Sequence, residues 1–165
     1  MMLTKRERHA QGQAAEDRFR LWLDRCHLPH IYVDQAPMTI PQHLRGEIKR
    51  PDFLVGIPTI GMTAIDVKAK RVYQDAILIE AYEHRTLMNF EMFLNMSVWF
   101  ACFPPDTPHT CHLFLNRSLT AMHSTTVNGE AVIAVPLRLT RPVDERRDFM
   151  AALLGAISLR GAELQ

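Results

Sequence analysis

The chain is 165 residues long, carries a formal net charge of +1, and is 47% hydrophobic and 22% charged. This length fits a single domain over residues 1–165 with one sizeable core, and the composition is that of an ordinary globular protein. The near-neutral charge excludes the strongly basic class of nucleic-acid-binding proteins but leaves a local basic patch open.

We expect neither a targeting segment nor a membrane segment. The N-terminus is charged and has no apolar h-region, and the longest strongly apolar run, residues 96–103, is far too short to span a bilayer. Cys26, Cys102 and Cys111 are odd in number and form no CxxC pair, which favours buried free thiols over a disulfide framework. A meeting of Cys102 and Cys111 on neighbouring strands remains an alternative. These features together predict a cytoplasmic protein.

The first part of the chain predicts a helix, a strand and a loop. Residues 5–26 place apolar side chains at three- and four-residue spacing, which indicates a helix with one buried stripe. Residues 30–37 are typical of a strand, and residues 38–50 of a loop. The helical stripe consists of Ala15, Phe19, Trp22, Leu23 and Cys26.

The rest of the chain predicts mainly strands. A hairpin over 52–57 and 62–69 is followed by a short strand at 76–81 and a helix from Glu83 to Asn95. Further strands are expected at 98–103, 112–116 and 131–140, the last at an edge or bulge because it contains Pro136. A terminal helix is expected over 144–159 with Asp144 as its N-cap. This order predicts an α/β fold with a central mixed sheet flanked by helices.

The hairpin carries three charged side chains within otherwise apolar runs. Asp66 and Lys68 are two residues apart and therefore share one face of their strand, while Ile65, Val67 and Ala69 face the other side. Pairing of the two strands brings Asp52 toward the end of the second strand. Two carboxylates repel each other unless a cation neutralises them, and hard oxygen ligands suit Mg²⁺ or Mn²⁺. The alternative is that Asp52 only begins a strand and that Asp66 and Lys68 form an exposed salt bridge.

Pro51-Asp52 followed by Asp66-Val67-Lys68 resembles the signature of the PD-(D/E)XK nuclease superfamily, with the two acids 14 positions apart. The resemblance implies a restriction-endonuclease-like core. It also implies catalysis by Asp52, Asp66, Lys68 and an upstream helical acid, for which this chain offers Glu16. Asp52, Asp66, Glu16 and the backbone carbonyl of Val67 would then bind Mg²⁺, with Mn²⁺ as an alternative. The layout is similar to the Holliday-junction-resolvase branch over residues 10–105, and the last third of the chain is not matched.

Other polar residues are candidates for supporting roles. A phosphate-contacting rim around the hairpin is one interpretation of four basic residues, although solvated surface charges are the alternative. Near the middle helix, an auxiliary role is open to Glu80, Glu83 and His84, although acids are favoured at any helix N-terminus. A zinc site at His109, Cys111 and His112 is disfavoured because no second ligand pair is present. The basic rim consists of Lys49, Arg50, Lys70 and Arg71.

The leading hypothesis is a metal-dependent deoxyribonuclease, an endonuclease rather than an exonuclease, with structure-selective or weakly specific cleavage. Its partner would be DNA, and it would work as a homodimer or as part of a larger complex. One alternative is a non-catalytic module that binds nucleic acid or protein on the same fold. Another is an accidental resemblance in a small α/β protein of unrelated role.

Overall fold

The computed structural model describes residues 4–36 and 40–162, with side chains up to residue 157. The expected strand at 30–37 and loop at 38–50 therefore lie partly outside the described residues. No described helix is long and apolar enough to cross a membrane.

A mixed sheet forms the centre of the fold, with strand order β1-β2-β3-β6-β7-β10. β3 and β6 run parallel, and the other neighbouring pairs described in this sheet are antiparallel. The mixed sheet expected from the sequence is thus confirmed. Its strands are β1 (His30–Tyr32), β2 (Phe53–Ile57), β3 (Gly61–Lys68), β6 (Val98–Cys102), β7 (Thr110–Leu115) and β10 (Arg141–Asp144).

A second, four-stranded sheet with the order β4-β5-β9-β8 is antiparallel throughout, and the sequence did not predict it. β5 corresponds to the short strand predicted at 76–81. β4 and β8 have too few apolar residues to be recognised by pattern. The strands are β4 (Val72–Tyr73), β5 (Ala76–Glu80), β8 (Ser124–Val127) and β9 (Glu130–Pro136).

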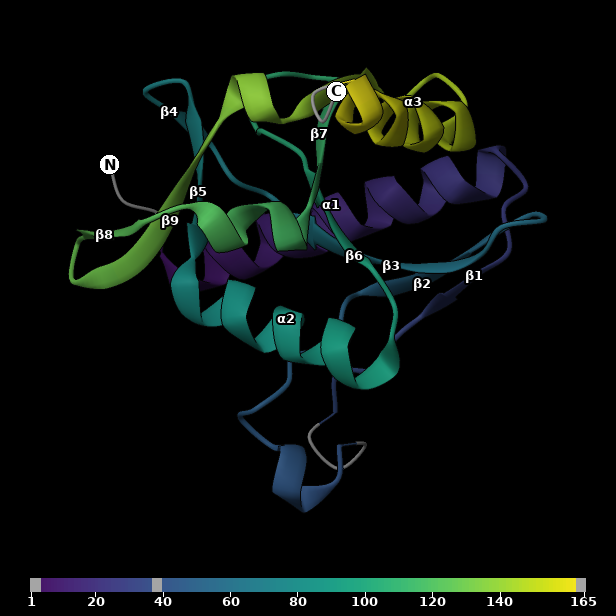
Figure 1. The fold of residues 1–165 in the computed structure, drawn as a ribbon. Helices are drawn as coiled ribbons and strands as arrows, with labels where there is room; N and C mark the ends of the chain where they lie inside the picture. The colour runs from purple at the N-terminus through teal and green to yellow at the C-terminus, as the bar shows by residue number, and fades with distance from the viewer. Residues whose placement is uncertain (1–3, 37–39, 163–165) are drawn as a thin grey trace.

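Helices cover both faces of the six-stranded sheet (Figure 1). α1 (Lys5–Arg25) and α3 (Phe149–Ala162) lie on one face, and α2 (Ala81–Leu94) lies on the other. Short 3-10 turns, η2 (Gln42–Leu44), η3 (Asn116–Ala121) and η4 (Leu137–Leu139), connect the elements.

The first core lies between the sheet and helices α1 and α3. Phe19, Trp22, Phe53 and Phe149 are fully buried there and meet edge to face, with ring centroids 5.0 Å apart between Trp22 and Phe149. The apolar stripe predicted for the first helix is confirmed, because its members at positions 15, 19, 22 and 23 are buried in this core. Burying aromatic side chains of this size is the main favourable term that holds α1 on the sheet.

The second core lies on the opposite face, where α2 and the four-stranded sheet meet the central sheet. Leu87 of α2, Phe100 of β6 and Ile133 of β9 belong to it. Cys102 is buried in this second core and Cys111 in the first, so the two free thiols lie on opposite faces of the sheet. The prediction of buried free thiols is confirmed for both.

Three expected boundaries are wrong. β1 ends at Tyr32 because Asp34 Oδ1 accepts a hydrogen bond from Ala36 N–H at 2.8 Å and turns the chain. β9 ends at Pro136, and the turn η4 follows it in place of a continued strand to residue 140. Asp144 is the last residue of β10 and not a helix cap.

The first turn of α3 is capped by Asp148. Its Oδ1 accepts a hydrogen bond at 2.8 Å from the N–H of Ala151, which lies three residues further along the chain. An aspartate in this position satisfies an N–H that has no partner within the helix.

Candidate active site

The two acids of the hairpin lie within electrostatic reach of each other. Asp52 directly precedes β2, and its backbone N–H donates to Ile65 O at 3.0 Å. Its side-chain Oδ2 accepts a hydrogen bond from Val67 N–H at 2.7 Å. The first acid is therefore fixed against the backbone between Asp66 and Lys68. Val67 and Ile65 point into the first core, while Asp66 and Lys68 point together to the side of α2.

Asp66 is the most deeply enclosed charge, with 0% of its surface exposed. Oδ1 contacts Lys49 Nζ at 2.6 Å, and Oδ2 contacts Lys68 Nζ. Burying a carboxylate is costly unless it is paired and hydrogen-bonded, and here one ammonium pairs with each oxygen. This burial excludes the alternative in which Asp66 and Lys68 form an exposed surface salt bridge.

Glu83 of α2 completes a ring of four alternating charges with these residues. Its Oε1 lies 2.5 Å from Lys49 Nζ and 3.0 Å from Lys68 Nζ. The side chains of Lys68 and Glu83 are 13% and 14% exposed, so both lie largely out of water. Each lysine thus bridges Asp66 and Glu83.

The charges of the ring shift one another's pKa values. Burial alone would lower the pKa of Lys68, but Asp66, Glu83 and Asp52 together raise it well above its ordinary value. Burial alone would raise the pKa of Glu83, but the two lysines lower it to about 2. Lys68 and Glu83 are therefore charged at neutral pH.

Asp52 lies outside the ring and behaves differently. Burial, together with the negative charge of Asp66, raises its pKa to about 7, and this outweighs the opposing effect of Lys68, Lys49 and the Val67 N–H. Among the described residues no hydrogen-bond donor to its Oδ1 is present. The carboxylate of Asp52 is thus short of positive charge.

Glu16 lies on α1 and contacts Tyr32 of β1, the strand that pairs with β2. It is half-buried, and its Oε2 accepts a hydrogen bond from the Tyr32 hydroxyl at 2.6 Å. That bond to Glu16, more than any other effect, raises the pKa of Tyr32 to about 12, and the charge of Asp52 contributes to the same shift. Tyr32 consequently lies within electrostatic reach of both acids.

The acids of the site have the oxygen chemistry that a divalent cation prefers. In the described part of the chain, no three His, Cys, Asp or Glu side chains are already arranged to hold a metal ion. The acids present are nonetheless of the right chemistry, and Asp52 has a carboxylate oxygen without a donor next to the buried Asp66. Asp52 and Asp66 therefore fit a hard cation, which would replace one of the two lysine ammonium groups on Asp66.

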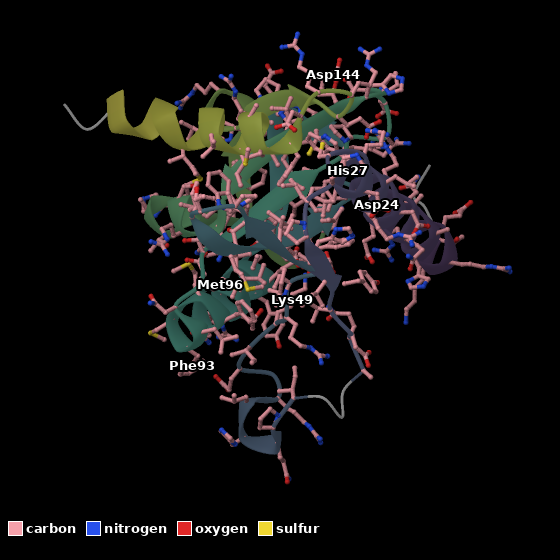
Figure 2. All side chains as sticks on the ribbon, turned by 90° about the vertical axis from the view of Figure 1, so that its right-hand side faces the viewer. Asp24, His27, Lys49, Phe93, Met96 and Asp144 are labelled. Carbon is pink, nitrogen blue, oxygen red and sulfur yellow. The ribbon has the colours of Figure 1, made fainter. Side chains whose placement is uncertain are left out.

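The four predicted rim residues have separate environments. Lys49 contacts Asp66 and Glu83 of the ring, and Figure 2 labels it together with Phe93 of α2 and Met96, which follows α2. Arg50 donates through Nη2 to Ala36 O at 3.2 Å. Lys70 and Arg71 form loose pairs at the surface, 3.5 Å from Glu80 and 3.8 Å from Asp106.

The remaining candidates lie away from the ring. Glu80 is half-exposed and pairs with Lys70, and the His84 ring shares a hydrogen bond with Asn116 Oδ1 at 2.9 Å. His112 is buried against Thr140, whereas His109 pairs with Glu145. The disfavoured zinc site at residues 109–112 finds no support in this arrangement.

Comparison with protein-family models gives no match, and no curated protein sequence matches the chain. A match to a solved structure decides the fold. The chain is similar to the 1.6 Å resolution structure of Hjc, a Holliday junction resolvase from the archaeal hyperthermophile Archaeoglobus fulgidus. The TM-score is 0.51 at 18% identity, and the match covers 74% of this chain and 88% of that one.

The likeness shows a shared fold, and the expected fold class, a central mixed sheet flanked by helices, is thereby confirmed. The match also covers a larger share of the chain than residues 10–105, to which the sequence resemblance extended.

Proposed function

We propose that the protein is a metal-dependent nuclease that hydrolyses phosphodiester bonds in DNA. The observation that carries the proposal is the wholly buried Asp66, bracketed by two lysines, beside an Asp52 whose pKa is raised to about 7. Buried charge clusters of this kind usually cost stability, and strongly shifted pKa values gather at functional sites. The nuclease-like fold supports the same conclusion.

The proposed cation is Mg²⁺, or alternatively Mn²⁺, held by Asp52, Asp66, Glu16 and the backbone carbonyl of Val67. When bound, it would lower the pKa of a coordinated water and stabilise negative charge on the phosphoryl group. Glu16 would have to exchange its hydrogen bond with Tyr32 for this role.

The chain's own residues do the remaining work in this proposal. Lys68, kept protonated by Asp66 and Glu83, donates a hydrogen bond to the attacking water or to a non-bridging phosphate oxygen. Asp52 is held in place by the Val67 N–H. Lys49, Arg50, Lys70 and Arg71 contact the phosphates that flank the cleaved bond, which positions the strand without reading its sequence.

Further features of the proposal concern context. We infer endonucleolytic cleavage that is selective for DNA structure more than for sequence, because a chain of this size has little surface for base readout. A homodimer or a larger complex would supply the area of DNA contact that a single chain lacks. The buried, free Cys102 and Cys111 are compatible with a reducing cytoplasm.

A cleavage assay tests the proposal. Purified protein is incubated with supercoiled, linear, branched and single-stranded DNA in Mg²⁺, Mn²⁺ or EDTA. We expect metal-dependent nicking that Asp66→Asn and Lys68→Met each reduce at least about 100-fold. The matched control is Asp24→Asn, which removes an exposed carboxylate near the end of α1 (Figure 2). Circular dichroism verifies that each variant is folded.

A non-catalytic binding module is the second candidate, because two lysines already neutralise Asp66. DNA binding without cleavage in any metal would favour that module. Absence of both binding and cleavage would contradict both functions.

A further inference from the structure

Lys49 is the cation in the ring that comes from outside the central sheet. Lys68 lies on the same strand as Asp66, whereas Lys49 belongs to the segment before β2. Its ammonium nevertheless lies 2.6 Å from Asp66 Oδ1 and 2.5 Å from Glu83 Oε1. Asp66 is one of the two acids that fit a divalent cation, so the Lys49 ammonium occupies an oxygen that the cation would need.

The backbone around Lys49 is anchored independently of its side chain. The segment 46–49 is joined to α2 by three hydrogen bonds: Lys49 N–H to Thr86 O at 3.2 Å, Asn89 Nδ2 to Glu47 O at 2.7 Å, and the Tyr82 hydroxyl to Gly46 O at 3.1 Å. A lysine side chain is a flexible stem with a compact charge. The ammonium can therefore leave Asp66 without unfolding the segment that carries it.

Each carboxylate of the ring keeps one cationic partner if Lys49 leaves, and the ring then has a net negative charge. Lys68 still contacts both Asp66 and Glu83, so neither carboxylate loses its last partner. Lys49 is also the more exposed of the two lysines, at 29% against 13% for Lys68. Of the two ammonium groups, that of Lys49 is the one that can turn toward a ligand outside the protein.

We infer that Lys49 is a positioning residue that exchanges its ammonium between two sites. In the DNA-free protein it occupies Asp66 and Glu83 and opposes the binding of a divalent cation. When DNA binds, it moves to a phosphate oxygen and leaves Asp66 to the cation. This inference rests on the proposed nuclease function. It adds that DNA binding favours cation binding and that cation binding favours DNA binding.

The coupling is reciprocal on thermodynamic grounds. If DNA removes the competing ammonium and thereby strengthens cation binding, the cation must strengthen DNA binding by the same factor. An opposite charge in direct contact shifts the proton affinity of a carboxyl group by about one to three pKa units, so a gain in cation affinity of about tenfold is expected when the ammonium leaves.

The first experiment measures binding of Mg²⁺ alone to the DNA-free protein by isothermal titration calorimetry. We expect Lys49→Met to bind Mg²⁺ about tenfold more tightly than the wild type, because the competitor is gone. Lys49→Arg keeps the charge and should bind as weakly as the wild type. Lys5→Met removes an exposed lysine at the start of α1 and should change nothing. Equal or weaker Mg²⁺ binding by a folded Lys49→Met protein would overturn the inference.

Lys49→Gln provides a second neutral variant should Lys49→Met fail to fold, and the same gain in affinity is expected for it. Circular dichroism in EDTA verifies the fold of each protein. A neutral variant that folds only when Mg²⁺ is added would also support the inference, because Mg²⁺ would then be replacing the lost ammonium.

The second experiment measures Ca²⁺ affinity with and without a short branched DNA, whose integrity is checked on a gel. DNA should strengthen Ca²⁺ binding about tenfold in the wild type and less than about twofold in Lys49→Met. If no divalent cation binds to either protein, both the proposed function and this inference fail. If the wild type cleaves DNA with Mg²⁺ but the two proteins show the same cation affinity and the same effect of DNA, only the inference fails.

Discussion

Asp52 and Asp66 act on each other electrostatically, yet they are neutralised differently. Asp66 has an ammonium group on each oxygen, whereas Asp52 accepts a hydrogen bond from one backbone N–H and is acted on by Lys68 and Lys49 only through their charge. Negative charge therefore accumulates on the Asp52 side of the site. In the metal-free protein this imbalance has a measurable consequence, because a carboxyl group with a raised pKa binds its proton more tightly in the native than in the unfolded state.

Asp52→Asn is expected to stabilise the metal-free protein at pH 8. The native pKa of Asp52 is raised to about 7 from 3.8, so the free energy of unfolding of the wild type falls as pH rises from about 4 to about 7. Asparagine removes the buried charge and can still accept the Val67 hydrogen bond. Urea denaturation in EDTA should show the variant more stable by roughly 2–4 kcal/mol at pH 8 and nearly equal to the wild type at pH 4. A variant that is less stable than the wild type at pH 8 would contradict the raised pKa of Asp52.

The hairpin acids and Lys68 were predictable from the sequence, but Lys49 and Glu83 as members of the same charge cluster were not. Alternation along a strand places Asp66 and Lys68 on one face, and hairpin pairing brings Asp52 to them. Lys49 and Glu83 are 34 residues apart on a loop and a helix, and no periodicity predicts that their side chains meet. The sequence placed Lys49 in a surface rim and left Glu83 open, since an acid near a helix N-terminus needs no special reason.

Two glycines show how closely the elements pack. Gly56 of β2 donates its backbone N–H to Pro29 O at 2.8 Å, and a Cβ at this position would lie 2.9 Å from Pro29 Cγ. Gly12 of α1 has open space, with nothing within 4 Å of an added Cβ. Close packing thus requires glycine at position 56 and does not require it at position 12.

Gly56→Ala and Gly12→Ala should have opposite effects on stability. Overpacking against the rigid proline ring should cost Gly56→Ala roughly 1–3 kcal/mol. Alanine is the better helix former, so Gly12→Ala should gain up to about 1 kcal/mol. Thermal unfolding monitored at 222 nm compares the two variants directly. A tolerated Gly56→Ala would mean that β2 can move away from Pro29.

The N-cap of α3 is Asp148, four residues later than the Asp144 that the sequence predicted. Asp144 and Asp148 are both acids of the kind that caps helices, and three-dimensional contacts distinguish them. Asp144 forms a two-point pair with Arg146, at 2.5 Å between Oδ2 and Nη2, at the end of β10. Asp148 has the hydrogen bond to Ala151 that a cap requires.

Asp148→Ala should therefore destabilise the protein more than Asp144→Ala. Loss of an aspartate N-cap costs about 1 kcal/mol, whereas an exposed ion pair contributes little. Chemical denaturation of both variants at neutral pH measures the difference. A larger loss in Asp144→Ala would show that its pair with Arg146 is the stronger anchor of α3.

At the scale of the whole molecule, the order of the main elements was predictable, and the second sheet was not. The long amphipathic helix, the hairpin and the buried strands each carry their own pattern. β4 has two residues and β8 has four, and these strands are stabilised by pairing with β5 and β9 and not by a pattern of their own. Each of these two strands therefore depends on a hairpin with the strand that follows it, and the sheet is joined by the pairing of β5 with β9, which is distant in sequence.

A net charge of +1 also limits how the whole molecule can hold DNA. Binding must come from a few local contacts, because there is no large overall attraction to the phosphates. Lys70 and Arg71 suit this role, since their pairs with Glu80 and Asp106 are long and near the surface, and such pairs are exchanged for phosphate at little cost. With Lys49 and Arg50 they give four proposed phosphate contacts per protomer.

The salt dependence of DNA binding tests that number. Each neutralised phosphate adds about −0.9 to the slope of log Kobs against log salt, so four contacts predict a slope of roughly −3.6 per protomer. Lys70→Ala and Arg71→Ala should each make the slope shallower by about 0.9, while Lys5→Ala, at the exposed start of α1, should leave it unchanged. Fluorescence anisotropy of a labelled duplex in EDTA at several salt concentrations measures each slope without cleavage. Slopes that stay at the wild-type value in both variants would place the phosphate contacts on another face of the protein.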